Sequence, residues 1–301
     1  MEAHTPTTQG KTLADLARVG RASLAQAGLE HAKQETAWIL ESVLGCQPLA
    51  LLVDGEREVL SKEWDEVLAV LARRARREPL QYLLGSQEFC GLDFTVNPAV
   101  FIPRPETELL VEELVRRCRS ASRPVLADIG TGSGCIAVSL AAALPDALVW
   151  ATDVSPEALM IARENARRHG VADRVRFLEG DLWDPIREAG LAGSLTGVAS
   201  NPPYISDREF PELQPEVRGF EPHRALAGGV DGLAVYRPLI EAAGGFLQPG
   251  GWLVLEAGAG QARALTQIGV DSGQYDEIQT RPDAAGIERV VCLHRRPGRE
   301  G

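Results

Sequence analysis

The chain has 301 residues, of which 45% are hydrophobic and 24% are charged, as in globular proteins with one or two cores. Its formal net charge of −11 argues against sequence-independent nucleic-acid binding, because cationic side chains supply most of that affinity. The polar first residues lack the apolar core of a secretory signal, and no membrane span is expected. Five scattered cysteines without CxxC pairs argue against a disulfide framework and a metal site, and they fit a reducing cytoplasm.

The region before Pro79 shows the periodicity of three amphipathic helices. Apolar residues recur at spacings of three and four, and Gly28 and Gly45 stand where the first two helices should end. Ser61 is placed to cap the third helix, which should stop before Pro79. Because the connections are short and polar, residues 1–79 are expected to form a small helical bundle.

The third predicted helix ends in a basic run, RRARR, at Arg73–Arg77. Cations at the carboxyl end of a helix complement its dipole, so the run fits a solvated helix end. A contact with RNA or with an acidic partner is the alternative interpretation. The sequence leaves both interpretations open.

Residues 80–103 differ in composition, with aromatic and β-branched residues between the breakers Gly85 and Gly91. This composition predicts a β-hairpin that links two domains. From residue 104 onward, after one helix, short apolar runs alternate with helical patterns, which is typical of a doubly wound parallel sheet. The fold class is therefore α/β, with a Rossmann-like domain over residues 104–301. Strands are expected at 125–130, 148–153, 174–181, 197–200 and 251–258, and an edge strand at 287–295.

The stretch DIGTGSG, Asp128–Gly134, follows the first strand predicted in the Rossmann-like domain and opens a helix. Glycine permits backbone conformations closed to other residues and lets a ligand approach the chain closely. The spacing is GxGxG, which differs from the GxGxxG of dinucleotide sites. Asp128 would repel a pyrophosphate but suits a cationic ligand with an α-amino group, such as S-adenosylmethionine. The residues predicted to bind this cofactor are Asp128, Gly130, Thr131, Gly132, Ser133 and Gly134, with packing inside the loop as the alternative for Thr131 and Ser133.

Two further acids follow the second and third predicted strands of this domain. Asp153 can accept hydrogen bonds from both ribose hydroxyls, as acids do in dinucleotide folds. Asp181 can accept a hydrogen bond from an adenine amino group, with Leu182 or Trp183 packed beside the ring. The alternative is that both acids cap the helices that follow them.

The stretch SNPPYIS, Ser200–Ser206, follows another predicted strand, at the edge where open α/β sheets bind their ligands. Pro202 and Pro203 have no N–H and fix their own φ, so this backbone is stiff and unsuited to a sheet ladder. It would hold the Asn201 side-chain oxygen and the Pro202 carbonyl as two fixed acceptors. An ordinary turn after a strand is the alternative interpretation.

Two acceptors that converge on one point fit an NH2 group, such as that of a glutamine amide or an adenine. The lone pair of such a nitrogen is delocalised, and hydrogen bonds that favour a pyramidal geometry free it for attack on a sulfonium methyl group. Tyr204 can pack on the planar target. Asn201, Pro202 and Tyr204 are therefore the predicted catalytic residues. Pro203 joins them in the predicted substrate site, Asn201 is also expected beside the cofactor, and no metal is expected.

Several longer stretches resemble a known family. They are EPLQYLLGSQEF, FIPRPETELLVE, FEPHRALAGGVDGL and DAAGIERVV, in addition to the glycine loop and NPPY. Together they resemble the HemK/PrmC family, the protein-(glutamine-N5) methyltransferases of peptide chain release factors. The resemblance implies a helical domain over 1–79 that helps to grip the release factor. It also implies a hairpin linker over 80–103 and a methyltransferase domain over 104–301.

The same resemblance implies a cofactor and a substrate. S-adenosylmethionine would donate the methyl group, and the acceptor would be the glutamine of the Gly-Gly-Gln motif of a class I release factor. The protein would work in the cytoplasm, without a membrane or a direct nucleic-acid substrate.

Three other functions fit parts of the sequence. A glutamine methyltransferase of a ribosomal protein would share NPPY. An adenine-N6 DNA methyltransferase would share it too, but the acidic charge counts against a DNA substrate. A binding protein that retains the fold without turnover is the third, and the intact glycine loop and NPPY count against it.

Four other polar residues have both structural and functional interpretations. Arg104, Glu106 and Glu108 begin the helix before the sheet, where acids favour the positive helix end; alternatively they lie near the methionine end of the cofactor. His223 is expected to be structural or exposed, not a general base.

Overall fold

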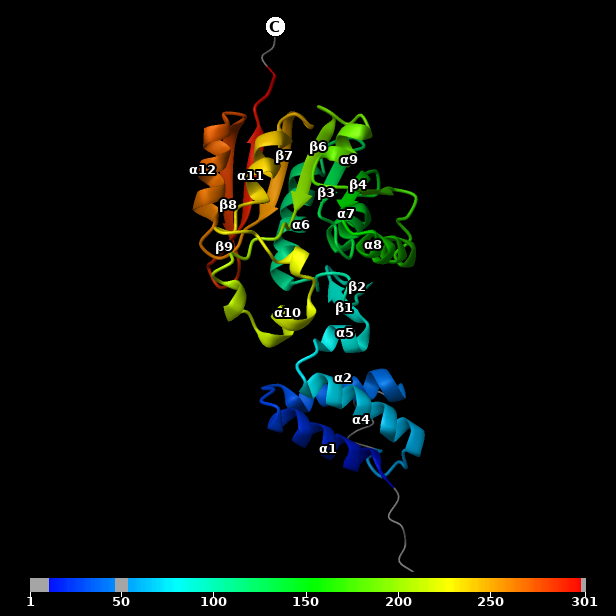
Figure 1. Ribbon diagram of the computed structural model, residues 1–301. Coiled ribbons are helices and arrows are strands. Elements are labelled where there is room, and N and C mark those ends of the chain that lie inside the picture. The colour runs from blue at the N-terminus through cyan, green and yellow to red at the C-terminus, as the bar shows by residue number, and fades with distance from the viewer. Residues whose placement is uncertain (1–10, 47–53, 299–301) are drawn as a thin grey trace, which may run out of the picture. The chain divides into compact units, whose positions relative to one another are not determined.

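The computed structural model describes residues 11–46 and 54–298, which fall into two compact units (Figure 1). Unit 1 comprises the described residues up to Gly85 together with Pro215–Phe220. Unit 2 comprises Ser86–Gln214 and the described residues from Glu221 onward. Among the described residues, no helix is long and apolar enough to cross a membrane.

Unit 1 is helical, and the three predicted helices are confirmed. Their apolar faces enclose one core, with Leu16, Ile39 and Val67 fully buried. Gly45 ends the second helix in the left-handed conformation that glycine favours. The helices are α1 (Leu13–Gln26), α2 (Ala32–Leu44), α4 (Ser61–Ala75), α5 (Leu80–Leu84) and α10 (Pro215–Phe220).

The predicted cap of the third helix is wrong by one residue. Ser61 is the first residue of α4, and Leu60 is the N-cap. The backbone N–H of Leu60 donates to the Glu63 carboxylate at 3.1 Å, so an acid in the first turn satisfies the helix end. A serine hydroxyl is therefore not needed there.

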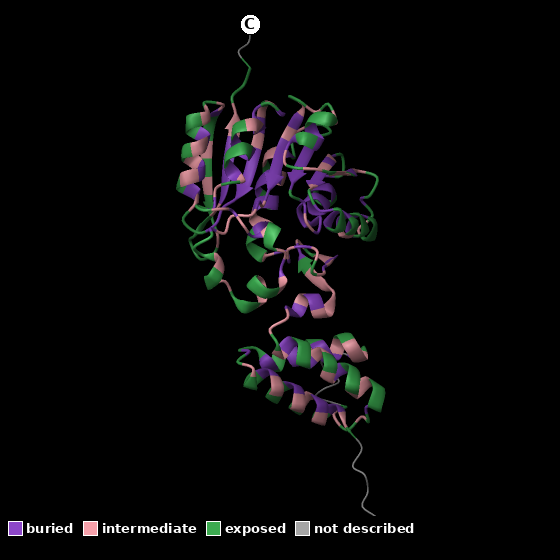
Figure 2. Ribbon diagram, in the orientation of Figure 1, coloured by how far each residue is buried: buried purple, intermediate pink, exposed green. Residues whose placement is uncertain are grey.

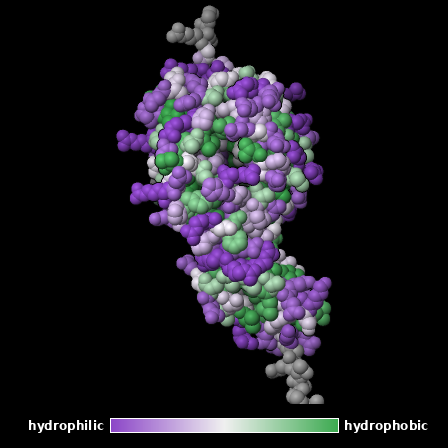
Figure 3. Space-filling model, viewed as in Figure 1, coloured by the Kyte–Doolittle hydropathy of each residue, from purple (hydrophilic) through white to green (hydrophobic). Residues whose placement is uncertain are grey.

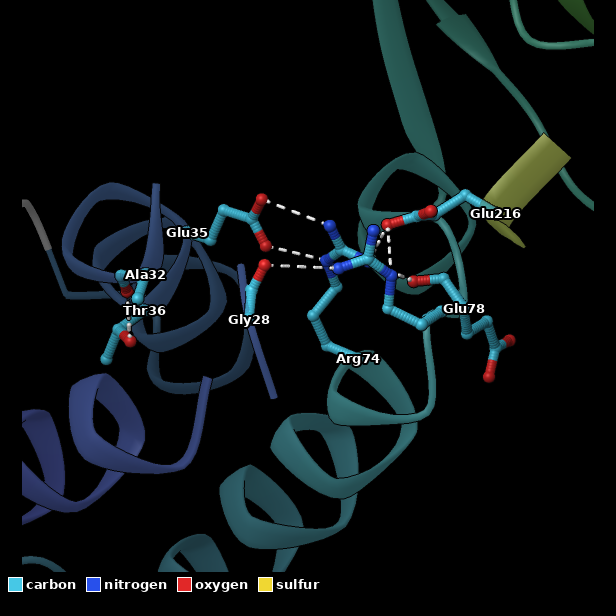
Figure 4. Close-up of polar contacts among 8 residues, drawn as sticks. Gly28, Ala32, Glu35, Thr36, Arg74, Glu78 and Glu216 are labelled. Atoms are coloured by element: carbon cyan, nitrogen blue, oxygen red, sulfur yellow. Dashed lines mark hydrogen bonds and ion pairs between the residues drawn. The ribbon is translucent and has the colours of Figure 1, made fainter. Parts of the chain in front are cut away.

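Most arginines of the basic run form ion pairs inside unit 1, and Figure 4 shows those of Arg74. The guanidinium of Arg74 is buried and bonds Glu35 of α2 at 2.6 Å and Glu216 of α10 at 3.1 Å. Arg77 also bonds Glu216, at 3.0 Å, and Arg73 bonds Glu78 at 2.6 Å. Neither a solvated helix end nor an external contact describes Arg74, which is a structural cation.

Unit 2 begins with the predicted hairpin, in a shortened form. The hairpin strands are β1 (Ser86–Phe89) and β2 (Leu92–Thr95), which pair in antiparallel register. The residues before them, at 80–84, form α5 and belong to unit 1, which the prediction of a hairpin from residue 80 missed. Phe89 and Phe94 are fully buried and meet edge to face, so the hairpin is packed by its aromatic side chains.

The main sheet of unit 2 has seven strands in the order β5-β4-β3-β6-β7-β9-β8. The first five in this order are parallel, while β9 is antiparallel to both of its neighbours. The strands are β3 (Val125–Ile129), β4 (Leu148–Asp153), β5 (Val175–Glu179), β6 (Leu195–Ser200), β7 (Leu247–Glu256), β8 (Tyr275–Pro282) and β9 (Glu288–Arg295). The predicted α/β fold is confirmed. The predicted edge strand is not at the edge, because β8, which the sequence pattern did not indicate, lies outside it.

Helices cover both faces of this sheet (Figure 1). One face carries α6 (Pro105–Cys118), α7 (Cys135–Ala143) and α8 (Pro156–Arg168); the other carries α9 (Asp184–Glu188), α11 (Tyr236–Ala243) and α12 (Ala262–Ser272). Figure 2 shows the strands largely buried, with exposed residues on the outer sides of the helices. On the face shown in Figure 3, hydrophobic and hydrophilic residues are interspersed over unit 2.

Candidate active site

The glycine loop and the NPPY segment leave neighbouring strands at the same edge of the sheet. Strands β3 and β6 pair in parallel with Asp128 opposite Ala199, so both chains emerge side by side. The buried hydroxyl of Ser200 donates to the carbonyl of Ile129 at 2.6 Å and fastens the bases of the two loops. The carboxyl edge at a reversal of strand order is where open α/β sheets bind ligands.

The glycine loop has the geometry of a cradle. Gly130 and Gly132 have φ of +77° and +54°, which side-chain-bearing residues rarely adopt, and a Cβ on either would meet no atom within 4 Å. Gly134 serves packing instead, because its Cβ would lie 3.0 Å from Ala162 of α8. The first two glycines therefore expose backbone to a ligand, and the third lets two helices approach closely.

Asp128 braces the loop from inside. Its side chain is fully buried, and one oxygen accepts hydrogen bonds from the Thr131 hydroxyl at 2.6 Å and from the Ala137 N–H at 3.1 Å. Burial raises the pKa of Asp128 to about 7 against these hydrogen bonds, and the charge of Asp153 raises it further. Thr131 thus packs inside the loop. A direct contact of Asp128 with a cofactor ammonium group stays a prediction.

Asp153 ends β4 and links the loop to the next strand. One carboxylate oxygen accepts from the Gly132 N–H at 2.8 Å and the other from the Ser155 N–H at 2.9 Å. Burial raises the pKa of Asp153, and the backbone hydrogen bonds oppose that shift. Each oxygen keeps lone pairs for a further donor. The carbonyl of Ser133 accepts a hydrogen bond from the Asn165 side chain at 2.8 Å, so Asn165 of α8 also holds the loop in place.

The residues after β5 separate into exposed and buried positions. Asp181 is exposed and Leu182 is half-buried. Trp183 is buried, stacks on Phe246 at a centroid distance of 4.5 Å, and donates its indole N–H to the carbonyl of Leu239 at 3.2 Å. Of the two alternatives for packing beside adenine, Trp183 is thus a core residue, and a contact of Leu182 with the ring stays a prediction.

The NPPY segment lies beside a buried acid. Asn201 is half-buried, and its Nδ2 donates to the hydroxyl of Thr107 in α6 at 3.2 Å. That hydroxyl donates in turn to the carboxylate of Glu256 at 2.5 Å, where Glu256 ends β7 beside β6. Pro202 is buried and Pro203 is half-buried. The stiff backbone predicted from the two prolines is thus seated against the core on one side.

Tyr204 is held closely by glycines and a glutamine. Gln261 donates to its carbonyl at 2.9 Å. A Cβ on Gly228 would lie 2.8 Å from the Tyr204 backbone, and one on Gly232 would lie 2.5 Å from its carbonyl oxygen. These approaches explain Gly228 and Gly232 of the GGVDGL stretch as packing against NPPY. Burial raises the pKa of the Tyr204 hydroxyl, so the ring is a neutral packing surface.

The sequence alone missed three residues of this edge: Thr107, Glu256 and Gln261. The only signals were a threonine between two acids in PETE and an acid before the AGAGQ turn. Nothing local in those stretches indicates that they meet NPPY.

Two of the other polar candidates, Arg104 and Glu108, have structural contacts. Arg104 pairs with the buried carboxylate of Glu221, which also accepts from the Ile102 N–H at 3.1 Å. Glu108 accepts from the Cys90 N–H at 3.0 Å. His223 lies beside Phe210 and is exposed, which is one of the two positions expected for it.

The residues at this edge fit S-adenosylmethionine. Open space over two glycines admits a ligand to the backbone, Asp153 keeps acceptor capacity for ribose hydroxyls, and the exposed Asp181 can meet an amino group. The surroundings are acidic, which suits a cationic ligand better than a phosphate. A glycine cradle beside a stiff NPPY segment is the arrangement expected of a methyltransferase that modifies an amino or amide nitrogen.

Family models support this class. Residues 92–213 match the family described as methyltransferase small domain, and residues 15–85 match the PrmC N-terminal domain. The chain is therefore an S-adenosylmethionine-dependent methyltransferase.

More specific relatives share most of the chain. A release factor glutamine methyltransferase of Geobacter sulfurreducens is 46% identical, covering 90% of this chain and 92% of that protein. One of Moorella thermoacetica is 44% identical, with 91% and 95% covered, and one of Deinococcus radiodurans is 40% identical, with 95% and 99% covered. The chain belongs to the release factor glutamine methyltransferase family.

Solved structures show the same fold at lower identity. A methyltransferase from Pyrococcus furiosus matches with a TM-score of 0.50 and 20% identity, covering 75% of this chain and 98% of that one. The hMettl16 catalytic domain in complex with MAT2A 3'UTR hairpin 6 matches with a TM-score of 0.54 and 15% identity, covering 80% and 85%. At these identities the likeness concerns the fold alone.

Proposed function

We propose that this protein transfers a methyl group from S-adenosylmethionine to the side-chain amide nitrogen of the glutamine in the Gly-Gly-Gln motif of a class I release factor. The observation that carries the proposal is the adjacency of the glycine loop and NPPY on the paired strands β3 and β6. Names of relatives that are 40–46% identical supply the substrate class.

The residues of NPPY would act on the acceptor amide. The Asn201 Oδ1 and the Pro202 carbonyl accept its two hydrogens, which favours the pyramidal nitrogen of the transition state over the planar ground state. Bound S-adenosylmethionine supplies a methyl group on a sulfonium leaving group. The new N–C bond forms as the S–C bond breaks, and the amide nitrogen then releases one proton to solvent. Tyr204 packs on the planar amide and excludes water.

The cofactor would be held by the loop and by three residues beyond it. Gly130 and Gly132 offer backbone, Asp153 offers acceptors to the ribose, and Asp181 with Leu182 offers a polar and an apolar contact to the base. Gly134 and Ser133 keep the loop in shape through packing and a backbone hydrogen bond.

We also infer a cytoplasmic location and no direct nucleic-acid substrate. All five cysteines are free thiols, which a reducing compartment maintains. The net charge of −11 and the pairing of Arg73, Arg74 and Arg77 with carboxylates leave little cationic surface for phosphates.

The substitution Asn201→Ala tests the chemistry. It should lower kcat by roughly two to three orders of magnitude, as the loss of an oxyanion-type contact does, while the affinity for S-adenosylmethionine stays nearly unchanged. Asn97→Ala, at another half-buried asparagine, is the control and should retain activity. An equal loss of cofactor affinity in Asn201→Ala would contradict the role assigned to this residue.

The substrate is tested with the unmodified protein and labelled cofactor. A class I release factor, a ribosomal protein and duplex DNA are offered in parallel, and the modified atom is mapped by mass spectrometry. Methylation of the Gly-Gly-Gln glutamine is the expected result. Label on the ribosomal protein or on adenine alone would replace the proposal with one of its two rivals.

A further inference from the structure

A chain of hydrogen bonds runs from a buried acid to the amide of NPPY. Glu256 ends β7 and is 2% exposed, and it accepts from the Thr107 hydroxyl at 2.5 Å. Thr107, in the first turn of α6, is likewise 2% exposed, and its oxygen lies 3.2 Å from Nδ2 of Asn201. Three elements far apart in sequence thus contribute one side chain each.

The direction of these bonds follows from the proton count of a hydroxyl. A threonine hydroxyl has one hydrogen and two lone pairs. While Glu256 is ionised, Thr107 uses its hydrogen on the carboxylate, so toward Asn201 it can only accept. The end of the Asn201 carboxamide that faces Thr107 must therefore be the NH2 group, and Oδ1 is turned away from Thr107.

We propose that Thr107 and Glu256 are positioning residues that fix the orientation of the Asn201 carboxamide, so that Oδ1 and not Nδ2 faces the acceptor amide. The inference rests on the proposed function, because only an NH2-bearing acceptor needs an oxygen at this place. A flipped carboxamide would present one NH2 group to another, and neither of them accepts a hydrogen bond.

The device is needed because an asparagine end group does not orient itself. Its terminal torsion is broad and roughly two-fold, and its oxygen and nitrogen are nearly alike in size. The hydrogen bond from Thr107 to the ionised Glu256 is charge-assisted, and a buried site strengthens it. The relay therefore orients Asn201 before the substrate arrives, so binding does not have to select one of two orientations.

The substitution Thr107→Val tests the relay, since it removes the hydroxyl and keeps the branched shape. We expect kcat for the Gly-Gly-Gln glutamine to fall about tenfold or more, as for a misplaced reacting group, with an unchanged Kd for S-adenosylmethionine by calorimetry. Thr107→Ser restores the hydroxyl and should keep kcat within about twofold of the unmodified protein, which a merely structural role of the side chain does not predict.

Thr36→Val is the matched control. Thr36 is also 2% exposed on a helix, and its hydroxyl donates to a backbone carbonyl, that of Ala32, at 2.6 Å, but it lies in the core of unit 1. It should leave kcat unchanged. If Thr107→Val is recovered unfolded, Thr107→Ala, a better helix former, takes its place with the same expectation.

Each outcome decides for or against the relay. The relay is supported if kcat falls in Thr107→Val but stays close to that of the unmodified protein in both Thr107→Ser and Thr36→Val. A folded Thr107→Val with kcat within twofold of the unmodified protein, a fall that Thr36→Val shares, or a parallel loss of cofactor affinity overturns it. Failure of the proposed function is distinguishable, because the unmodified protein itself would then leave the Gly-Gly-Gln glutamine unlabelled.

Discussion

Two buried carboxyl groups of unit 2, Asp128 and Glu256, each accept a hydrogen bond from a threonine hydroxyl at the candidate site. Asp128 holds Thr131 inside the glycine loop, and Glu256 holds Thr107 beside NPPY. Burial raises the pKa of both acids to about 7, because a charge is poorly solvated in the interior. At Glu256, the hydrogen bond from Thr107 and the charge of Arg289 oppose the rise, whereas the charge of Glu106 adds to it.

This shift predicts how Glu256 contributes to stability against pH. The folded pKa of about 7 lies above the ordinary value of 4.5, so the contribution is fully present below 4.5 and is lost as the pH rises through about 7. Glu256→Gln does not ionise. The difference in unfolding free energy between this variant and the unmodified protein should therefore shift by about 2 kcal/mol in favour of the variant when the pH is raised from 5.5 to 8. Urea unfolding at the two pH values measures this gain.

Glu164→Gln, at an exposed position of α8, is the control for this experiment and should show no such gain. A difference between Glu256→Gln and the unmodified protein that is the same at both pH values would contradict the assigned shift.

At the scale of elements, one guanidinium joins three helices of unit 1. Arg74 of α4 bonds Glu35 of α2 and Glu216 of α10, and all three side chains are at most 15% exposed (Figure 4). The helix α10 is only six residues long and comes from the stretch after NPPY, so local propensity alone would not hold it. The buried ion pairs supply the tertiary contact that it needs.

Arg74→Ala should therefore be costly to stability. It leaves the Glu35 carboxylate buried without its cation, while Glu216 keeps its ion pair with Arg77. The loss of one partner of a buried pair typically costs about 3 kcal/mol or more. Urea unfolding of the full chain measures the loss. Arg76→Ala, in the same basic run but exposed, should change stability by about 0.5 kcal/mol at most. Similar losses in the two variants would show that burial of Arg74 carries no special weight.

At the scale of the whole molecule, binding of S-adenosylmethionine would distinguish an enzyme from a protein that keeps the fold without turnover. The net charge of −11 favours a cationic ligand such as S-adenosylmethionine at an edge that bears Asp153 and Asp181. Ligand binding to the folded state raises its stability by mass action. The size of this effect depends on the concentration of ligand over its Kd.

S-adenosylmethionine at about 100 times its Kd should stabilise the protein by about 2.7 kcal/mol. For a unit of this size, that gain corresponds to a rise in Tm of about 5 °C or more. Thermal unfolding with and without the cofactor measures the rise, and NAD, a dinucleotide with a pyrophosphate, should produce none. An unchanged Tm with S-adenosylmethionine would favour the scaffold.

The sequence by itself determined the five parallel strands and the longer helices between them, the glycine loop and the NPPY segment. These depend on periodicity, on the φ of glycines and on the missing N–H of prolines, all of which act within a few residues. The tertiary structure alone decided that β9 lies inside the sheet, that Trp183 packs in the core, and that Arg74 is buried. It alone also brought Thr107 and Glu256 to Asn201. These outcomes depend on contacts between residues far apart in the chain, and no local pattern encodes which distant partner a side chain will meet.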